Sequence, residues 1–289
     1  MDGVINIYKP AGITSFDVVR KVKKVCGIKK VGHTGTLDPL ATGVLPVCVG
    51  KATKIVDYIM NDFKIYNAVL KLGEVTDTYD KEGKILSSSP VKVSEEEIKK
   101  AVFSFEGEIN QVPPMYSALK VNGKKLYELA RQGIEIERKE RQITIYKIDI
   151  VSIESPFVSI KVKCSKGTYI RSLCYDIGNY LSCGAYMWSL ERESTGSFKK
   201  ENSIMLDELS SENIDKFILP LDKALDMYEK ITVLNSMEKL LINGAEIGDP
   251  RLIPSINEGE MKRVYLENGN FIGIGLRLNN KFKITKLLI

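Results

Sequence analysis

The order of apolar and polar residues along the chain predicts a mixture of strands and helices. Alternation between apolar and polar positions, or a short continuous apolar run, predicts strands, and these fall at residues 4–8, 45–49, 64–73, 143–153 and 157–164. Apolar residues three or four positions apart predict helices, which fall at residues 15–26, 52–60, 94–105, 126–132 and 169–181. Two of these helices carry start signals: Ser15 is the expected N-cap of the first, and Ser94 with Glu97 forms a capping box.

The last part of the chain has a different pattern. From Thr232 onward, short strand-like runs alternate with turn signals such as Asn243-Gly244 and Asn268-Gly269. A segment of about sixty residues is near the lower limit for independent folding. We therefore expect an α+β fold in two parts: a mixed-sheet domain at residues 1–230 and a small all-β domain at residues 231–289.

Composition places the chain among ordinary globular proteins. Of its 289 residues 44% are hydrophobic and 27% are charged. No apolar run approaches the length of about eighteen residues that would cross a membrane, and the first residues do not resemble a secretory signal. The five scattered cysteines are expected to be reduced thiols rather than metal ligands. These features predict a cytoplasmic protein that holds no metal and does not bind a membrane.

The basic residues gather in two places, although the net charge is only +5. One cluster precedes residue 31, and the other lies between residues 120 and 141. Charged clusters usually form solvated surface, but two of them beside a glycine-rich segment favour a polyanionic partner. The residues expected to contact this polyanion are Lys9, Lys29, Lys30, Lys120, Lys124, Lys125, Arg131 and Arg141.

The segment 31–46 concentrates unusual residues. It contains His33, the only histidine of the protein, together with three glycines and the step Asp38-Pro39. One interpretation is purely structural: Asp38 caps a short helix that begins at Pro39. The other is that the glycines allow the backbone to approach a ligand beside one reactive carboxylate.

This segment, Gly32-His33-Thr34-Gly35-Thr36-Leu37-Asp38-Pro39, resembles the catalytic motif of the bacterial tRNA pseudouridine synthases of the TruB type. The resemblance implies that Asp38 is the catalytic carboxylate. Four further segments match in the same order: Lys9-Pro10-Ala11-Gly12, Lys64-Ile65-Tyr66-Asn67-Ala68, Gly167-Thr168-Tyr169-Ile170-Arg171 and Leu190 to Phe198.

The same resemblance implies roles for several residues around Asp38. Arg171 would pair with Asp38, with Tyr169 beside it in the motif. Tyr66 would stack on the target base, His33 would lie beside the flipped nucleotide, and Leu190 would form a wall of the pocket. This chain has Glu191 where the family commonly has an arginine, which puts one expected RNA contact in doubt.

The resemblance also implies the substrate and the outer RNA contacts. Residues 111–142 would form an insertion that holds the elbow and T-arm of tRNA, and residues 231–289 would form a PUA-like RNA-binding domain. The expected reaction is conversion of uridine 55 of tRNA to pseudouridine after base flipping, by a monomer that uses no cofactor. The alternative is an RNA-binding or RNA-folding protein in which Asp38 is only a helix cap.

Overall fold

The computed structural model describes residues 1–121, 123–250 and 252–289. Most strands belong to one mixed sheet of eleven strands, with the order β14-β1-β3-β12-β4-β11-β10-β7 and with β2, β13 and β15 joined at its sides. Its strands are β1 (Gly3–Lys9), β2 (Val31–His33), β3 (Thr42–Val49), β4 (Lys64–Leu72), β7 (Gly107–Gln111), β10 (Arg141–Glu154), β11 (Phe157–Cys164), β12 (Ala185–Thr195), β13 (Phe198–Lys199), β14 (Ile204–Met205) and β15 (Ile218–Leu219).

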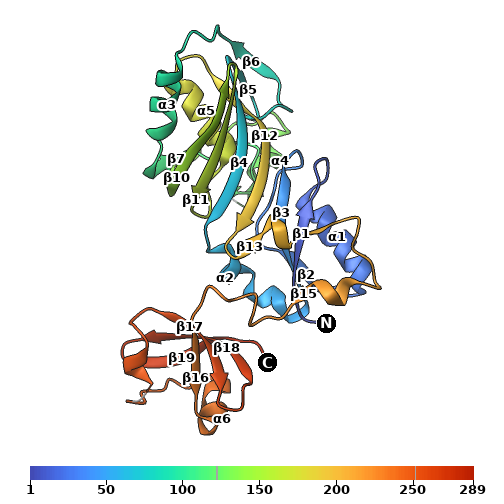
Figure 1. The fold of residues 1–289 in the computed structure, drawn as a ribbon, viewed down its shortest axis with the longest axis vertical. Helices are drawn as coiled ribbons and strands as arrows, with labels where there is room; N and C mark the ends of the chain where they lie inside the picture. Colours follow the sequence, from blue (N-terminus) through green and yellow to red (C-terminus); the bar gives the residue numbers. More distant parts are fainter. Residues whose placement is uncertain (122, 251) are drawn as a thin grey trace.

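Helices and smaller strand pairs complete the fold. Helices α3 and α5 lie against the part of the sheet that contains β4, β10 and β11, whereas α1 lies beside β1 (Figure 1). The remaining elements are α1 (Ser15–Cys26), α2 (Val56–Met60), α3 (Glu95–Phe103), α4 (Leu126–Ala130), α5 (Ile170–Tyr180), α6 (Glu238–Ile242), the pair β5 (Glu74–Thr76) and β6 (Ile85–Ser88), and the pair β8 (Lys120–Val121) and β9 (Lys124–Lys125).

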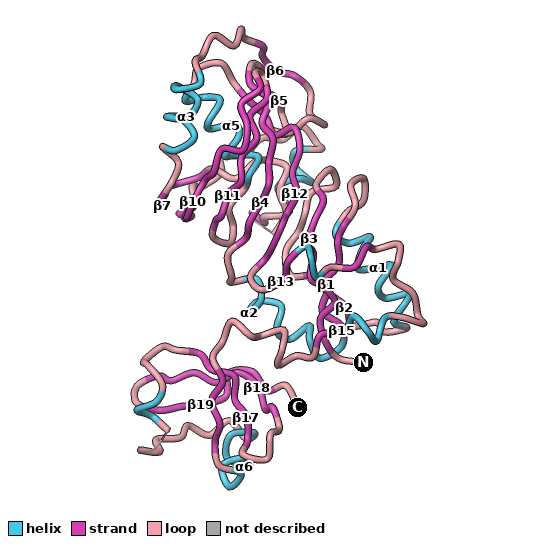
Figure 2. Tube along the Cα trace, viewed as in Figure 1, coloured by secondary structure: helices cyan, strands magenta, loops and turns pink. Residues whose placement is uncertain are grey.

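The C-terminal unit has its own sheet and its own core. Strands β16 (Lys230–Val233), β17 (Met261–Leu266), β18 (Phe271–Leu278) and β19 (Lys281–Leu287) form a four-stranded sheet that lies apart from the large one (Figure 2). The mixed-sheet α+β class with a small β unit is therefore confirmed. The unit also includes the short helix α6, which the sequence pattern did not predict.

The two parts of the chain touch through apolar side chains. Ile274 and Leu288 of the C-terminal unit pack in one cluster with Val4 and Ile55 of the larger part, and all four are nearly or fully buried. The division at residue 230 remains a prediction, because these side chains form a common apolar interface.

The register of each strand decides which residues face the core. In β4 the even-numbered residues from Lys64 to Leu72 are buried and the odd-numbered residues are partly exposed. In β12 the buried face includes Leu190 and Arg192, whereas Glu191 and Glu193 are partly exposed. This alternation is the pattern of a sheet that buries one face.

The N-cap of helix α1 lies one residue earlier than the sequence predicted. This residue is Thr14, whose hydroxyl accepts from the main-chain N–H of Asp17, while the carboxylate of Asp17 accepts from the N–H of Thr14. Ser15 is instead buried inside the helix, and Phe16, expected on the apolar face, is 59% exposed. The buried face is formed by Val18, Val19 and Val22.

The described residues contain no helix that is both long enough and apolar enough to span a bilayer.

Candidate active site

Asp38 lies in the loop between β2 and β3, and it does not cap a helix. The N–H of Ala41 donates to the carbonyl of Asp38 at 3.1 Å, which closes a turn, and strand β3 then begins at Thr42. The helix-cap interpretation is therefore wrong. The side chain of Asp38 is 29% exposed, so it can meet a ligand while remaining partly shielded from water.

Buried side chains from distant elements hold this loop on one side. The hydroxyl of Ser15 accepts from the N–H of Leu37 at 2.9 Å and donates to the carbonyl of the same residue at 3.1 Å. The ammonium of Lys9 donates to the carbonyls of Pro39, Pro10 and Ile13 at 3.2, 2.8 and 2.8 Å. The residues that flank Asp38 in the chain, Leu37 and Pro39, are thus both fixed through their backbones.

The same contacts overturn one expected role. Lys9 was predicted to contact RNA, but it is fully buried and the three N–H bonds of its ammonium all have carbonyl acceptors. Burial lowers the pKa of Lys9 to about 8, an effect that the nearby Asp38 opposes. Lys9 therefore orders the loop around Asp38 instead of contacting a phosphate.

On the opposite side of the loop, Gly43 allows a very close approach. Gly43 has φ +112°, and a Cβ at this position would lie 2.2 Å from the carbonyl oxygen of Arg192. The guanidinium of Arg192 donates through Nε to the carbonyl of Val44 at 2.7 Å and through Nη2 to that of Gly35 at 3.2 Å. Sequence reasoning treated this stretch as a possible RNA contact and missed that Arg192 is buried.

Arg171 provides the cationic partner of Asp38. It lies in the first turn of α5 and its side chain is only 5% exposed, so it is not the ordinary surface arginine that its position alone would suggest. Nη2 donates to Oδ1 of Asp38 at 2.9 Å, and Nε makes an ion-pair contact with Oδ2 at 2.8 Å. Further donors reach the carbonyls of Thr78 and Tyr116, at 3.2 and 2.8 Å. This two-point contact orients both oxygens of the Asp38 carboxylate.

A second carboxylate, Asp80, lies near Arg171 and was not predicted. Its Oδ2 is 3.6 Å from Nη1 of Arg171, and its Oδ1 accepts from the hydroxyl of Thr78 at 2.6 Å. Burial raises the pKa of Asp80, while the Thr78 hydroxyl and Arg171 act in the opposite direction. Asp80 comes from an ordinary polar loop between β5 and β6, and nothing in its local sequence distinguishes it from a surface aspartate.

Tyr66 and Leu190 form a wall of neighbouring side chains on β4 and β12. Leu190 pairs with Ala68, and Tyr66 pairs with Arg192, so these residues occupy adjacent positions on the buried face of the sheet. Tyr66 is 9% exposed and Leu190 is 8% exposed. Burial raises the pKa of the Tyr66 phenol, which keeps it protonated at neutral pH. An aromatic ring and an aliphatic side chain here are suited to a flat, uncharged base.

His33 and Tyr169 approach from other elements. His33 ends β2 and is partly buried, and its Nδ1 accepts from the N–H of Gly35 at 3.3 Å. Burial and the charge of Arg192 lower its pKa, so the imidazole is neutral and keeps its donor on Nε2. Tyr169 is the N-cap of α5, and its N–H and carbonyl pair with the buried amide of Gln111 at 2.8 and 3.0 Å. Tyr169 thereby anchors the start of the helix that carries Arg171.

Glu191 lies on the partly exposed face of β12, on the opposite side from Leu190 and Arg192. Its carboxylate accepts from the hydroxyl of Tyr8 at 2.5 Å and pairs with the ammonium of Lys200 at 2.6 Å. Glu191 therefore lies on the other face of the strand from Leu190 and Arg192, and its effect on the RNA contact expected at this position stays open.

The other cations expected to contact RNA are at the surface. Lys29 and Lys30 are exposed just before β2, and Lys120, Lys124, Arg131 and Arg141 are exposed in or beside the insertion. Lys125 is half-buried, and it and Arg131 both lie 5.4 Å from the ring centre of Tyr127. Among the described residues of segment 111–142, Met115, Leu126 and Leu129 form a small apolar cluster.

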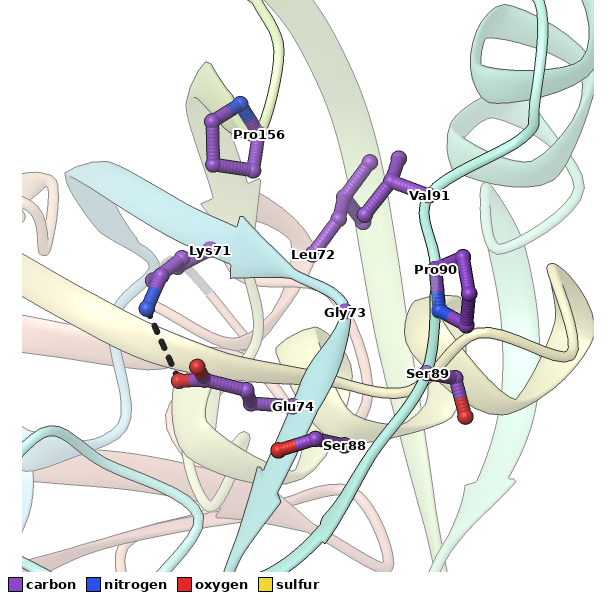
Figure 3. A pocket seen from close by; sticks show the side chains of 9 residues that line it. All are labelled: Lys71, Leu72, Gly73, Glu74, Ser88, Ser89, Pro90, Val91 and Pro156. Atoms are coloured by element: carbon purple, nitrogen blue, oxygen red, sulfur yellow. Dashed lines mark hydrogen bonds and ion pairs between the residues drawn. The ribbon is translucent and has the colours of Figure 1, made fainter.

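A hollow of about 360 Å³ lies beyond the end of β4, whereas Tyr66 is near the start of that strand. Figure 3 shows its walls: Leu72, Pro90, Val91 and Pro156 line it, and its one lysine, Lys71, is paired with Glu74 at 2.8 Å. This lining offers little to hold a phosphate, and the hollow is separate from the side chains around Asp38. Over the described ranges, no three side chains of His, Cys, Asp and Glu gather where they could share a metal ion.

Two protein-family models match the sequence between residues 23 and 226. Residues 23–170 match the model of the TruB family pseudouridylate synthase N-terminal domain, and residues 171–226 match that of the tRNA pseudouridylate synthase B C-terminal domain. The boundary between the two matches falls at the start of α5 and within one continuous sheet, so it does not separate two folding units.

Full-length relatives cover the whole chain. The chain is 61% identical over 289 residues to the tRNA pseudouridine synthase B of Clostridium novyi (strain NT), with complete coverage of both chains. It is 48% identical over 296 residues to that of Alkaliphilus oremlandii (strain OhILAs), covering 100% of this chain and 99% of the relative.

A solved structure has the same fold over nearly the whole chain. The crystal structure of a Cbf5-Nop10-Gar1 complex contains a chain that matches with a TM-score of 0.77 and 30% identity. The match covers 99% of this chain and 85% of that one.

Proposed function

Because this chain belongs to the TruB family of pseudouridylate synthases, it is an enzyme that isomerises uridine in tRNA, and we propose that it acts on uridine 55 of the T-loop with Asp38 as its catalytic carboxylate. One observation carries the assignment of the residue. Asp38 is held by a two-point contact from the buried Arg171, in a loop whose neighbouring carbonyls are fixed by Lys9 and Ser15.

The reaction needs a carboxylate at such a place. The bond between N1 of the base and C1′ of the sugar breaks, a bond between C5 and C1′ forms, a proton leaves C5, and N1 gains a proton. Breaking the first bond develops positive charge on the sugar, which a fixed anion stabilises. Attack on C1′, addition to the base and removal of a sugar proton all require the same ionised oxygen beside the nucleotide.

Arg171 keeps this carboxylate available. A carboxylate in a partly dry site is costly unless a cation and hydrogen bonds compensate for lost water. The guanidinium supplies both, and its Nη1 and Nη2 also donate to the carbonyls of Thr78 and Tyr116. The charge of Asp38 is thus oriented before the substrate arrives, so little reorganisation is needed during the reaction.

The surrounding side chains are suited to a flipped base. A uridine inside folded tRNA is stacked, and an enzyme must replace that stacking when it extrudes the base. Tyr66 would offer its ring and Leu190 an aliphatic wall, while the neutral His33 would donate a hydrogen bond to the nucleotide and Tyr169 would hold the start of α5 beside it. The outer contacts would come from Lys29 and Lys30 and from the cations of the insertion, Lys120, Lys124, Lys125, Arg131 and Arg141.

The remaining roles concern partners and location. Residues 231–289 would add RNA contacts as a PUA-like domain beyond a boundary at residue 230, and residues 111–142 would hold the tRNA elbow. The five cysteines are free thiols, which suits the reducing cytoplasm. Light scattering during gel filtration would test the further expectation that the protein is a monomer.

Unmodified tRNA transcript provides the test of function. Incubation with wild-type protein should create one pseudouridine at position 55, mapped by chemical modification and primer extension. Asp38→Asn keeps the size of the side chain but removes its charge, so we expect a loss of at least about 10⁴-fold in rate, with tRNA affinity and melting temperature near wild type. A variant that still forms pseudouridine at nearly the wild-type rate would overturn the role of Asp38.

A further inference from the structure

Arg192 has an unusual environment for a charged side chain. It lies on the buried face of β12 and is only 2% exposed. The acceptors that hold its guanidinium are main-chain carbonyls, those of Val44 at 2.7 Å and Gly35 at 3.2 Å. Burying an arginine is costly, and carbonyl dipoles compensate for its charge less completely than a carboxylate would. A position of this kind calls for a function that a leucine or methionine would not serve.

The two carbonyls lie on either side of Asp38 in the chain. Gly35 precedes Asp38 by three residues and Val44 follows it by six, so one guanidinium connects both arms of the loop. The backbone of Arg192 strengthens the connection, since it forms the parallel pair with Gly43 where a Cβ could not fit. Arg192 therefore holds both arms of the loop against β12 through its side chain and its backbone.

Arg192 is also the direct cross-strand partner of Tyr66. The two residues face each other in the pairing of β12 with β4, and both side chains are on the buried face. The positive charge of Arg192 lowers the pKa of Tyr66 against the larger raising effect of burial, and it also lowers the pKa of His33. Arg192 is thus the cross-strand neighbour of Tyr66, and its guanidinium bonds Gly35, the residue whose N–H donates to His33, so it borders both side chains that are proposed to contact the nucleotide.

Resting on the proposed function, we propose that Arg192 is a positioning residue for pseudouridine formation, whose guanidinium sets the spacing between the loop that presents Asp38 and the ring of Tyr66. The carboxylate would lie on the sugar side of the flipped nucleotide and the ring on its base side. A displacement of about 1 Å between two such groups can slow a reaction about 100-fold without weakening binding.

The test compares two substitutions at this position with a matched control. Arg192→Met removes the charge and both hydrogen bonds, whereas Arg192→Lys keeps the charge with a shorter reach. The control is Asn213→Ala, because the Asn213 side chain is likewise bonded to two main-chain groups, accepting from the N–H of Ser210 at 2.9 Å and donating to the carbonyl of Glu208 at 2.8 Å, in a segment to which no role in catalysis or RNA binding is assigned. For each protein we would measure the single-turnover rate at saturating tRNA, the tRNA affinity, the melting temperature, and amide hydrogen exchange of residues 33–46.

We expect Arg192→Met to slow the single-turnover step about 100-fold at nearly unchanged tRNA affinity. Its hydrogen exchange should increase in residues 33–46 but not across the large sheet. Arg192→Lys should recover part of the rate. Asn213→Ala should lower the melting temperature while retaining the wild-type rate and the wild-type exchange of residues 33–46.

Other results would overturn the role. A folded Arg192→Met or Arg192→Lys protein with both the rate and the loop exchange of wild type would do so. A rate that falls only as the folded fraction falls, with exchange increased everywhere, would show that Arg192 is merely structural. If Arg192→Met does not fold, Arg192→Lys decides between these results. Failure of wild-type protein to form any pseudouridine would instead refute the proposed function, so the two failures are distinguishable.

Discussion

The loop around Asp38 and the proposed insertion at residues 111–142 are held in place in different ways. Neither is built on long helices or strands: apart from the ends of β7 and β10, the described residues of segment 111–142 form the two-residue strands β8 and β9 and the five-residue helix α4. The loop is fixed by buried polar side chains from β1, α1 and β12, whereas the insertion has a small apolar cluster and an exposed basic surface.

This contrast reflects what each region is proposed to do. A reacting group must be in place before the transition state, because reorganisation during the reaction raises the barrier. A phosphate contact needs mainly charge, which acts over several ångströms and tolerates movement. Substitutions of the same kind should therefore have different consequences in the two regions.

The largest difference in rate should come from removing the arginine that holds Asp38 and, for comparison, an arginine of segment 111–142. Arg171→Met leaves Asp38 without its cation and the carbonyls of Thr78 and Tyr116 without a donor. We expect the single-turnover rate to fall about 1000-fold, as when one charge-stabilising donor is lost from an active site. The matched change in the insertion is Arg138→Met, which removes a hydrogen bond to the carbonyl of Pro113. At saturating tRNA it should alter the rate less than about threefold. If both variants lost rate to a comparable degree, the two regions would not differ in their effect on the reaction.

A protein truncated after Lys230 tests whether the region around Asp38 folds without the C-terminal unit. The truncation exposes Val4 and Ile55, which pack with Ile274 and Leu288, and each buried aliphatic side chain contributes about 1.5–3 kcal/mol. We expect a melting temperature lower by roughly 5 °C or more and tRNA affinity about tenfold weaker, with turnover retained at high tRNA concentration. Thermal unfolding and saturation kinetics measure both. An insoluble or wholly inactive truncated protein would mean that the two parts form one folding unit.

Two lysines allow the same substitution to be compared directly. Lys9→Met removes the donor from three carbonyls in the interior, and unsatisfied buried acceptors cost about 1–3 kcal/mol each. We expect a lower melting temperature and a rate reduced about tenfold, with an unchanged salt dependence of tRNA binding. Lys124→Met should instead leave stability and rate unchanged and reduce the slope of log affinity against log salt by about one. Lys9→Met with a reduced salt slope would show that Lys9 contacts phosphate after all.

The difference between these lysines explains what the sequence could and could not predict. Asp38, Arg171 and Tyr66 were identified by motifs that match a family, and the strand and helix that carry Arg171 and Tyr66 followed from apolar periodicity. Lys9 was predicted at the RNA surface, because a lysine beside a turn gives no local sign that its ammonium will be enclosed by the nearby carbonyls of Pro10 and Ile13 together with the distant carbonyl of Pro39. A prediction of burial would have needed the tertiary structure.

Arg192 and Asp80 show two different kinds of missing information. Arg192 shares the buried face of β12 with Leu190, but the apolar pattern did not predict this strand, and an arginine between two glutamates suggests exposure. Asp80 had no local signal, since its burial depends on a contact between its loop and β12. Residues that act through long-range contacts are thus the ones that local patterns miss.

The smallest effect concerns Asp176, which lies on α5, the helix that carries Arg171. Burial raises the pKa of Asp176 to about 6, above its ordinary value of 3.8. The folded protein therefore binds this proton more tightly than the unfolded chain does. Its ionisation costs no stability below about pH 4, costs progressively more as the pH rises to about 6, and has its full cost above that.

Asp176→Asn should remove this cost, so we expect its melting temperature to exceed that of wild type by about 2 °C at pH 8 and to match it near pH 4.

The exposed Asp17 provides the opposite case. The Thr14 hydroxyl and N–H, together with Arg20, lower the pKa of Asp17 to about 2, so its charge stabilises the fold above about pH 4 and that contribution is lost as the pH falls through about 2. Asp17→Asn should therefore be less stable than wild type at pH 8, where Asp176→Asn is more stable. If thermal unfolding shows both variants changing in the same direction at pH 8, the partners of Asp17 and the burial of Asp176 do not control their charges as the structure indicates.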